Sequence, residues 1–436
     1  MDRRLFLASG LVALAGPALG GPATAGRDAR ALHVVVTWHR LVLELVRHTA
    51  TYSPPVAARA FGYLGVIAHE TLAAMDPALR SLGGQLNGLA APRRAPGSLD
   101  RAAALNGALS VAALELFGNT GPTGQRAHAA LDRRLAAEAA EGIAPALAEA
   151  SRAEGVRVAR HVLDWAQTDG GAVIENLGFP HDYTPGEGPA AWVPTSGVRL
   201  QQAPLLPYWG RVRPFAMPAG DTCRIPPPPA YDETPGSPFH AAAREVCDVA
   251  AALTEEQALI ARFWSDDPML SPTPAGHWLS ILLDVALRER LPVAALAGAL
   301  ARLGAAQADA FIACWAAKYH YNLLRPVTYI RRVIDPGWQP LLITPPFPEY
   351  PSGHSTQSAA SALVLTALFG EGYAFEDRTH VDDGLPVRSF PSFRAAAEEA
   401  AVSRLYGGIH FRFGNAAGID LGRCVGAHAA ALRTAA

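Results

Sequence analysis

The sequence has little net charge, few cysteines and, beyond its N-terminal segment, no long apolar run. Its 37 Lys and Arg residues balance 39 Asp and Glu residues, and the formal charge of −2 gives no general attraction to nucleic acid or to an anionic membrane. The four cysteines are too few and too scattered for a disulfide framework or a CxxC metal site. We therefore expect small, buried apolar residues at Cys223, Cys247, Cys314 and Cys424. The mature chain is predicted to have no membrane span, because no later run approaches the roughly 20 apolar residues required.

The chain of 436 residues is half hydrophobic, 17% charged and 8% aromatic, which is enough for a folded core. Apolar residues recur every three to four positions and predict helices over five ranges. These ranges are 31–77 (broken at Pro54), 99–118, 123–167, 240–264 and 275–323. Residues 170–240 hold 14 of the 36 prolines and show no strand-like alternation, so they predict a long irregular belt. The expected fold class is all-α, one or two bundles with this Pro/Gly-rich belt, and residues 26–436 are predicted to form a single domain.

The first 25 residues have the pattern of an export signal. Arg3 and Arg4 precede the apolar run 5–18, and residues 23–25 supply the small side chains that a signal peptidase prefers. The arginine pair resembles a twin-arginine signal, which directs folded proteins out of the cytoplasm. We predict that residues 1–25 are removed and that the protein is exported, to the periplasm or the medium.

A first group of candidate site residues lies near position 320. Lys318 and Arg325 are seven residues apart on a helix that we expect to end at Pro326. Seven steps of 100° fall about 20° short of two turns, so both cations would lie on one face and close on one anion. Taken alone, such a pair is more often a solvated helix face.

A second group is the sequence Pro351-Ser352-Gly353-His354, followed by the Ala-, Ser- and Leu-rich run 355–369. This run predicts a buried helix whose N-terminus favours an anion. Glycine at the junction lets backbone amides approach the anion, Ser352 adds a hydroxyl, and His354 adds a group that titrates near neutrality. A capped loop with a surface histidine is the alternative.

A third group combines Arg404 and His410. They are six residues apart and would not share a face of an unbroken helix, but Gly407-Gly408 can end the helix and turn His410 back toward Arg404. The alternatives are a salt bridge for Arg404 and a core role for His410.

Together, these groups resemble the three-part signature of vanadium-dependent haloperoxidases and type 2 phosphatidic acid phosphatases, which include bacterial acid phosphatases. Four further segments resemble the soluble bacterial haloperoxidase branch: Ser53–Arg59, Pro207–Gly210, Phe263–Asp266 and Pro274–Trp278. The resemblance implies a helical haloperoxidase/phosphatase-type fold in which residues 300–425 carry an oxyanion site.

The resemblance also implies roles for the site residues and vanadate as the cofactor. The residues expected to bind vanadate are Lys318, Arg325, Ser352, Gly353, Arg404 and His410. His410 would bond the vanadium, His354 would take a proton from hydrogen peroxide, and Lys318 would assist the oxidation of halide. An apolar residue at Phe347, where the family varies, suits chloride or bromide. A homodimer is expected from family habit alone.

Two other functions fit the same residues. In an acid phosphatase without vanadate, His410 would form a phosphohistidine from a phosphomonoester and His354 would protonate the leaving alcohol. In an oxyanion-binding protein without turnover, only the cations would be needed.

One position departs from the signature, which usually carries an acidic residue four places after its last histidine. Gly414 stands there, so His410 is expected to donate to another acceptor, Asn415 or a backbone carbonyl. Asp266 or Asp267 is expected to pair with an active-site arginine.

Overall fold

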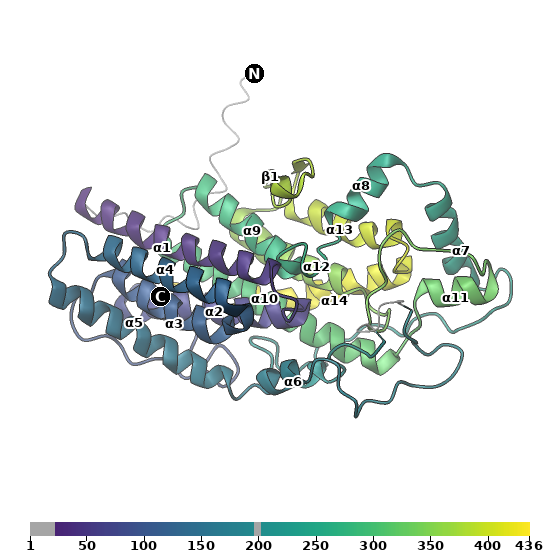
Figure 1. The fold of residues 1–436 in the computed structure, drawn as a ribbon, viewed down its shortest axis with the longest axis horizontal. Helices are drawn as coiled ribbons and strands as arrows, with labels where there is room; N and C mark the ends of the chain where they lie inside the picture. Colours follow the sequence, from purple (N-terminus) through teal and green to yellow (C-terminus); the bar gives the residue numbers. More distant parts are fainter. Residues whose placement is uncertain (1–21, 196–201) are drawn as a thin grey trace, which may run out of the picture.

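The computed structural model describes residues 22–195 and 202–436 and shows an elongated body of helices (Figure 1). One end holds α1 (Pro22–Arg47), α2 (Pro54–Met75), α3 (Arg101–Leu116), α4 (Gly121–Ala140) and α5 (Pro145–Ala166). The remaining α-helices are α6 (Gly171–Leu177), α7 (Pro238–Ala251), α8 (Glu255–Phe263), α9 (Thr273–Arg288), α10 (Val293–Tyr321), α11 (Pro326–Val333), α12 (Gly353–Phe369), α13 (Phe393–Tyr406) and α14 (Arg412–Ala430). The described part has one two-stranded sheet, β1 (Phe375–Asp377) antiparallel to β2 (Arg388–Phe390). The all-α prediction is confirmed.

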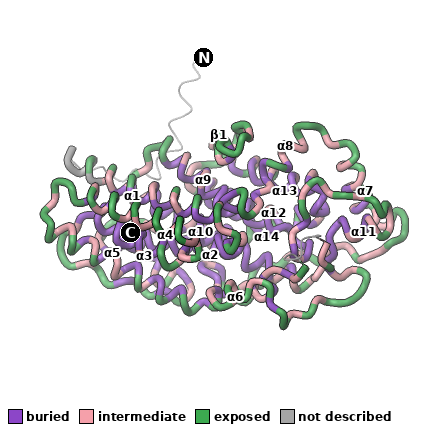
Figure 2. The backbone as a smooth tube through the Cα atoms, in the orientation of Figure 1, coloured by how far each residue is buried: buried purple, intermediate pink, exposed green. Residues whose placement is uncertain are grey.

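The helix α10 is the central element of the body. It packs against α2 on one side and against α12 and α14 on the other, and Figure 2 shows the buried interior along it. Its Ala- and Gly-rich sequence permits close approach: a Cβ on Gly304 would lie 2.7 Å from the Cα of Gly62 in α2. Because α10 is buried for most of its length, it holds Lys318 and the residues that follow it in a fixed position.

Three of the predicted helices are wrong in extent, because each is two helices in the structure. The range 123–167 breaks between α4 and α5, where Gly142 has a φ of 70° and Pro145 starts the next helix. The range 240–264 breaks before Thr254, which forms a capping box with Gln257 at the start of α8. The range 275–323 breaks before Pro292, which precedes α10. Hydrophobic spacing continues across these short connections, so it did not reveal them.

In its described residues, 170–195 and 202–240, the predicted belt is irregular except for α6, a 3-10 turn at Trp209–Arg211 and the start of α7. Asp309 of α10 fixes it to the body by accepting the backbone N–H groups of Phe215 (2.5 Å), Ala216 (2.8 Å) and Met217 (2.8 Å). Burial raises the pKa of Asp309 to about 7 despite these bonds.

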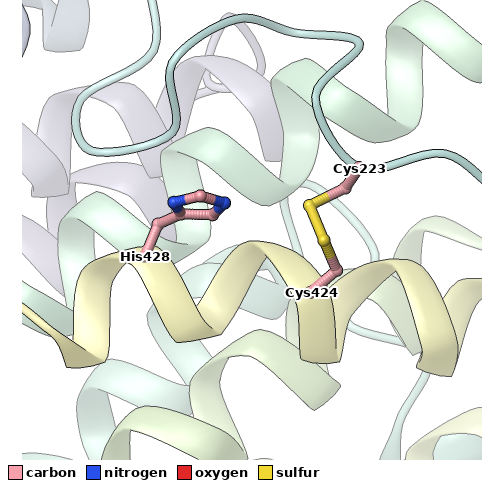
Figure 3. Close-up of side chains that lie close together, drawn as sticks. All are labelled: Cys223, Cys424 and His428. Atoms are coloured by element: carbon pink, nitrogen blue, oxygen red, sulfur yellow. A yellow bond between two sulfur atoms is a disulfide. The ribbon is translucent and has the colours of Figure 1, made fainter.

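A disulfide corrects the expectation for the cysteines. Cys223 of the belt is bonded to Cys424 of α14, 201 residues later, with a Cα–Cα distance of 5.9 Å (Figure 3). Cys247 and Cys314 are free, and Cys314 is buried as expected. The sequence argument failed because a bridge between distant segments has no local spacing pattern. His428 lies further along α14, beside sulfur atoms that are already bonded to each other.

The structure bears on the N-terminal predictions only in part. Residues 1–21 of the predicted export signal lie outside the described residues, and the predicted cleavage site at residues 23–25 falls in the first turn of α1. In the part of the chain that the structure describes, no helix is both long and apolar enough to cross a bilayer.

Candidate active site

The structure brings the three groups of predicted site residues together at the C-terminal half of the body. Lys318 lies in the last turn of α10, Arg325 caps α11, and Ser352 caps α12. Arg404 lies in the last turn of α13, and His410 precedes α14. All five are buried, with at most 2% of each residue exposed. His354, on the first turn of α12, is partly exposed.

The two cations of the first group converge, although the helix expected to carry both is interrupted. α10 ends at Tyr321, because Asn322 adopts a left-handed conformation with φ 47° and ψ 39°. The expectation of one continuous helix to Pro326 is therefore wrong. The turn nevertheless places Lys318 Nζ 5.2 Å and the Arg325 guanidinium carbon 5.0 Å from the centre of the Phe347 ring.

The loop before α12 holds both cations by its carbonyl groups. Lys318 Nζ donates to the carbonyls of Pro348 (2.8 Å) and Glu349 (2.9 Å). Arg325 Nε donates to the carbonyl of Phe347 at 2.9 Å. Since an ammonium has three protons, Lys318 keeps one N–H for a ligand.

His410 is held between an arginine and a carboxylate. Arg325 Nη1 donates to His410 Nε2 at 3.0 Å, and His410 Nδ1 donates to Glu349 Oε1 at 2.8 Å. A guanidinium can only donate, so Nε2 carries the lone pair and Nδ1 carries the proton. Gly408, with a φ of 75°, makes the turn that the sequence predicted between Arg404 and His410.

The acceptor for His410 was predicted wrongly. Asn415 instead accepts from Ser355 Oγ at 3.4 Å, and the acceptor on Nδ1 is the side chain of Glu349 rather than a backbone carbonyl. Sequence reasoning missed Glu349, although it stands five residues before His354. Gly414, which stands where the signature usually has an acidic residue, was the one indication that another segment supplies the acid.

The second group forms the start of α12. Ser352 Oγ accepts from the backbone N–H of Ser355 at 3.4 Å, and the backbone N–H of Ser352 donates to the carbonyl of Gly414 at 3.0 Å. A Cβ on Gly353 would make only ordinary contact, 3.6 Å from Trp315. The glycine thus leaves its amide open but is not required by close packing.

Buried polar atoms without partners mark where a ligand would bind. Within residues 22–195 and 202–436, Arg325 Nη2 and His354 Nε2 are buried and form no hydrogen bond. An unpaired buried group is costly, typically about 1–3 kcal/mol. A tetrahedral oxyanion such as phosphate or vanadate would accept from Arg325 Nη2 and from the remaining N–H of Lys318. The residues present therefore fit an oxyanion.

Burial shifts the pKa values of the basic side chains in the site toward their neutral forms. Burial lowers the pKa of Lys318 to about 7 and that of Arg325 and Arg404 to about 10. Burial also lowers the pKa of His354 and His410 well below the ordinary value of 6.5, and Arg404 adds to the effect on both. Both histidines are neutral at pH 7, so each has a lone pair for a proton or a ligand atom.

A carboxylate enclosed with these cations is also perturbed. Burial raises the pKa of Glu349 to about 7, although the nearby charges of Lys318 and Arg325 oppose the shift. An anion in the site would favour the charged forms of the cations, and binding should therefore be coupled to proton uptake.

Arg404 is fixed by hydrogen bonds rather than by a direct ion pair. Its Nε donates to Ser403 Oγ at 3.0 Å and its Nη2 to the carbonyl of Ala261 at 3.1 Å. Asp267 and Asp266 act on it only through their charges, which oppose the lowering of its pKa. The expected pairing of Asp266 with an arginine is wrong, because Asp266 accepts from two histidines.

Those histidines belong to a buried ion network that the sequence analysis missed. His277 lies between Asp266, at 3.0 Å, and Asp377, at 2.7 Å, while His380 Nε2 lies 3.1 Å from Asp266. Burial alone would lower the pKa of His277, but the two carboxylates raise it to about 10. The group Asp266, His277 and His380 has ligand atoms close enough for a metal ion, yet these atoms already hydrogen bond one another. Asp266 and His277 lie in Phe263–Asp266 and Pro274–Trp278, two segments that resemble the haloperoxidase branch. This resemblance was the only feature of the sequence that pointed to the network.

Comparison with known proteins gives the family. The model of the "VCPO second helical-bundle domain" matches residues 299–337 and 332–435. A vanadium-dependent bromoperoxidase of Ascophyllum nodosum is 37% identical over 94 residues, which cover 19% of this chain and 17% of the bromoperoxidase. The alignment thus spans less than a fifth of the bromoperoxidase.

Solved structures match over nearly the whole chain. The crystal structure described as the first bacterial vanadium-dependent iodoperoxidase has a TM-score of 0.85 and 36% identity, covering 93% of this chain and 97% of that one. A bacterial vanadium-dependent chloroperoxidase in its apo form has a TM-score of 0.67 at 18% identity, covering 86% of this chain and 93% of that one, and supports the fold alone. Because this iodoperoxidase is 36% identical and covers 93% of the chain, the chain belongs to the vanadium haloperoxidase family and is an enzyme.

Proposed function

We propose that the protein binds vanadate and uses hydrogen peroxide to oxidise a halide. The observation that carries the proposal is the burial of three cations near His410: Arg325 donates to His410 Nε2, and the charges of Lys318 and Arg404 also act on this histidine. Arg325 Nη2 and His354 Nε2 have no hydrogen-bond partner. Such an array of fixed donors recognises a tetrahedral oxyanion and stabilises the negative charge that builds up during reaction.

Each site residue has a proposed role that follows from its chemistry. Lys318, Arg325 and Arg404 would hold the charge of vanadate, with the Ser352 hydroxyl and the Gly353 amide as further donors, and His410 Nε2 would be the protein ligand to the metal. Bound vanadate would supply the Lewis acidity that activates hydrogen peroxide toward a halide.

His354 is the proposed proton acceptor. The residue is partly exposed, and its buried Nε2 has no hydrogen-bond partner, so this atom would be available to take a proton from incoming hydrogen peroxide. Its lowered pKa keeps the imidazole neutral, as an acceptor must be. Lys318 donates two of its three N–H groups to the carbonyls of Pro348 and Glu349, so the third would be available to bound vanadate.

We propose iodide as the preferred halide. The relative that is 36% identical along its length is described as an iodoperoxidase, whereas the chloroperoxidase structures are 18% and 19% identical. The Phe347 ring, on which the expectation of chloride or bromide rested, lies against Lys318 and Arg325 and thus packs beneath the cations.

Activity measurements on vanadate-loaded and vanadate-free protein test the proposal. We expect peroxide-dependent oxidation of iodide that requires vanadate and exceeds the oxidation of bromide and chloride. Hydrolysis of a phosphomonoester without halide oxidation would establish the phosphatase alternative. Tight binding of vanadate with neither activity would establish the binding-protein alternative.

We also propose that the protein is exported, as the N-terminal pattern predicts. The Cys223–Cys424 disulfide supports this proposal, because disulfides form and persist mainly in oxidising compartments outside the cytoplasm. Replacing Arg3 and Arg4 together by lysine should retain the protein in the cytoplasm if the twin-arginine route is used, as measured by cell fractionation. The homodimer stays a prediction.

A further inference from the structure

We propose that Glu349 takes the place of the acid that the family signature carries at position 414, and that it positions His410 for bonding to vanadium. Because Gly414 has no side chain, it leaves the room that the Glu349 carboxylate needs. The inference rests on the proposed function and concerns how the site is built in this chain.

The first observation is a double hydrogen bond to one carboxylate oxygen. Glu349 Oε1 accepts from His410 Nδ1 at 2.8 Å and from the backbone N–H of Phe411 at 3.0 Å. The first bond fixes the orientation and the tautomer of the imidazole, and leaves the Nε2 lone pair directed at the cations. The second ties the same carboxylate to the residue that caps α14.

The second observation is the place of residue 414 in α14. Phe411 is the N-cap, so 414 is the third residue of the helix, from which an acidic side chain commonly reaches back to the N-cap N–H. In this chain the first turn of α14 contains no acid, and Glu349 accepts that same N–H from a different segment. Glu349 therefore makes the hydrogen bond to the Phe411 N–H that an acidic residue at 414 would be expected to make.

The third observation is steric. A Cβ on Gly414 would lie 2.2 Å from Glu349 Oε1 and 2.8 Å from Oε2, far inside normal contact distance. Side chains at 349 and 414 therefore exclude each other in this backbone. Glu349 cannot easily withdraw, because it is fully buried and its backbone N–H donates to the carbonyl of Leu323 at 2.9 Å.

These contacts predict that the effect of an acid at 414 depends on residue 349. Gly414→Asp alone should weaken vanadate binding, because the new Cβ would collide with the Glu349 carboxylate. Glu349→Ala alone should lower vanadate affinity about 10–100-fold, the usual effect of removing a group that orients a metal-ligating histidine. In the double variant, Gly414→Asp should restore vanadate affinity to within a few-fold of the unmodified protein.

A comparison of two anions separates positioning from simple support of the fold. Vanadate needs His410 Nε2, whereas phosphate is held by the cations alone, so Glu349→Ala should weaken vanadate binding and leave phosphate binding unchanged or stronger. Glu245→Gln, which removes a carboxylate from a surface ion pair with Arg412, is the matched control and should change neither affinity.

Calorimetric titration of the unmodified protein, the three variants at 349 and 414 and the Glu245→Gln control with vanadate and with phosphate gives these affinities, and thermal unfolding shows which variants are folded. Equal losses for both anions in folded Glu349→Ala, or no recovery in the folded double variant, would overturn the proposal. Failure of the unmodified protein to bind vanadate would instead overturn the proposed function.

The unmodified protein provides a test that does not depend on the folding of variants. In nitrogen-15 NMR of histidine-labelled protein, the signals that disappear in His410→Gln should show a neutral imidazole with its proton on Nδ1. A proton on Nε2 would refute the assigned role of Glu349.

Discussion

Replacing Arg404 by alanine removes one of the three buried cations that define the proposed vanadate site. The arginine is 2% exposed, and its Nε and Nη2 are held by Ser403 and Ala261. A side chain fixed in this way loses little further conformational freedom when it binds an anion. Lys318 and Arg325 remain in the variant, so binding should weaken without being abolished.

The magnitude follows from the bond that is lost. A hydrogen bond to a charged group contributes about 1.5–3 kcal/mol, which corresponds to about tenfold to over a hundredfold in affinity for vanadate or phosphate. The variant should also raise the pKa of His354, because the positive charge of Arg404 helps to lower it.

Titration calorimetry with phosphate and with vanadate measures the loss. Arg412→Ala is the matched control, because Arg412 is an exposed arginine in a surface ion pair with Glu245 and should not affect either affinity. Unchanged affinity in Arg404→Ala, with the fold intact by circular dichroism, would place Arg404 outside the site and refute the argument.

Three further predictions concern the histidines and the disulfide. His410→Ala should abolish halide oxidation yet retain phosphate binding, whereas His354→Ala should retain bound vanadate and lose about 10²–10⁴-fold in turnover; full turnover in either variant would contradict its role. Replacing both Cys223 and Cys424 by serine should lower the free energy of unfolding by up to about 5 kcal/mol for a closed loop of this length, as measured in urea; an unchanged midpoint would contradict it. The folded-state pKa of His277, about 10, exceeds the ordinary 6.5, so its contribution to stability is fully present below pH 6.5 and is lost as the pH rises toward 10. Urea unfolding between pH 6.5 and 10 should show this decline in the free energy of unfolding. If the decline is absent in His277→Gln, His277 is the group responsible for it.

The turns and helix ends that carry the candidate site residues were predictable because they are local in the sequence. Each group contains its own turn or helix end, such as the glycine pair before His410 and the capping residue before Gly353, and the structure contains the corresponding turns. The convergence of Lys318 and Arg325 was predicted for a wrong reason. A left-handed residue at Asn322, which no spacing rule indicates, replaced the expected continuous helix.

The features that escaped prediction depend on contacts between distant segments. Glu349 and Gly414 are complementary only because the loop before α12 lies against the start of α14. The Cys223–Cys424 bridge and the bonds from Asp309 to the belt arise in the same way, from tertiary packing. Helix breaks were missed for a different reason, since apolar spacing continues across a short turn.

A vanadate titration of the purified chain, with metal analysis after removal of free vanadate, tests the central claim most directly. Three cations and the N-terminus of α12 predict saturable binding of about one vanadate per chain and its displacement by phosphate. Binding that does not saturate, or that phosphate does not displace, would contradict an oxyanion site formed by these residues.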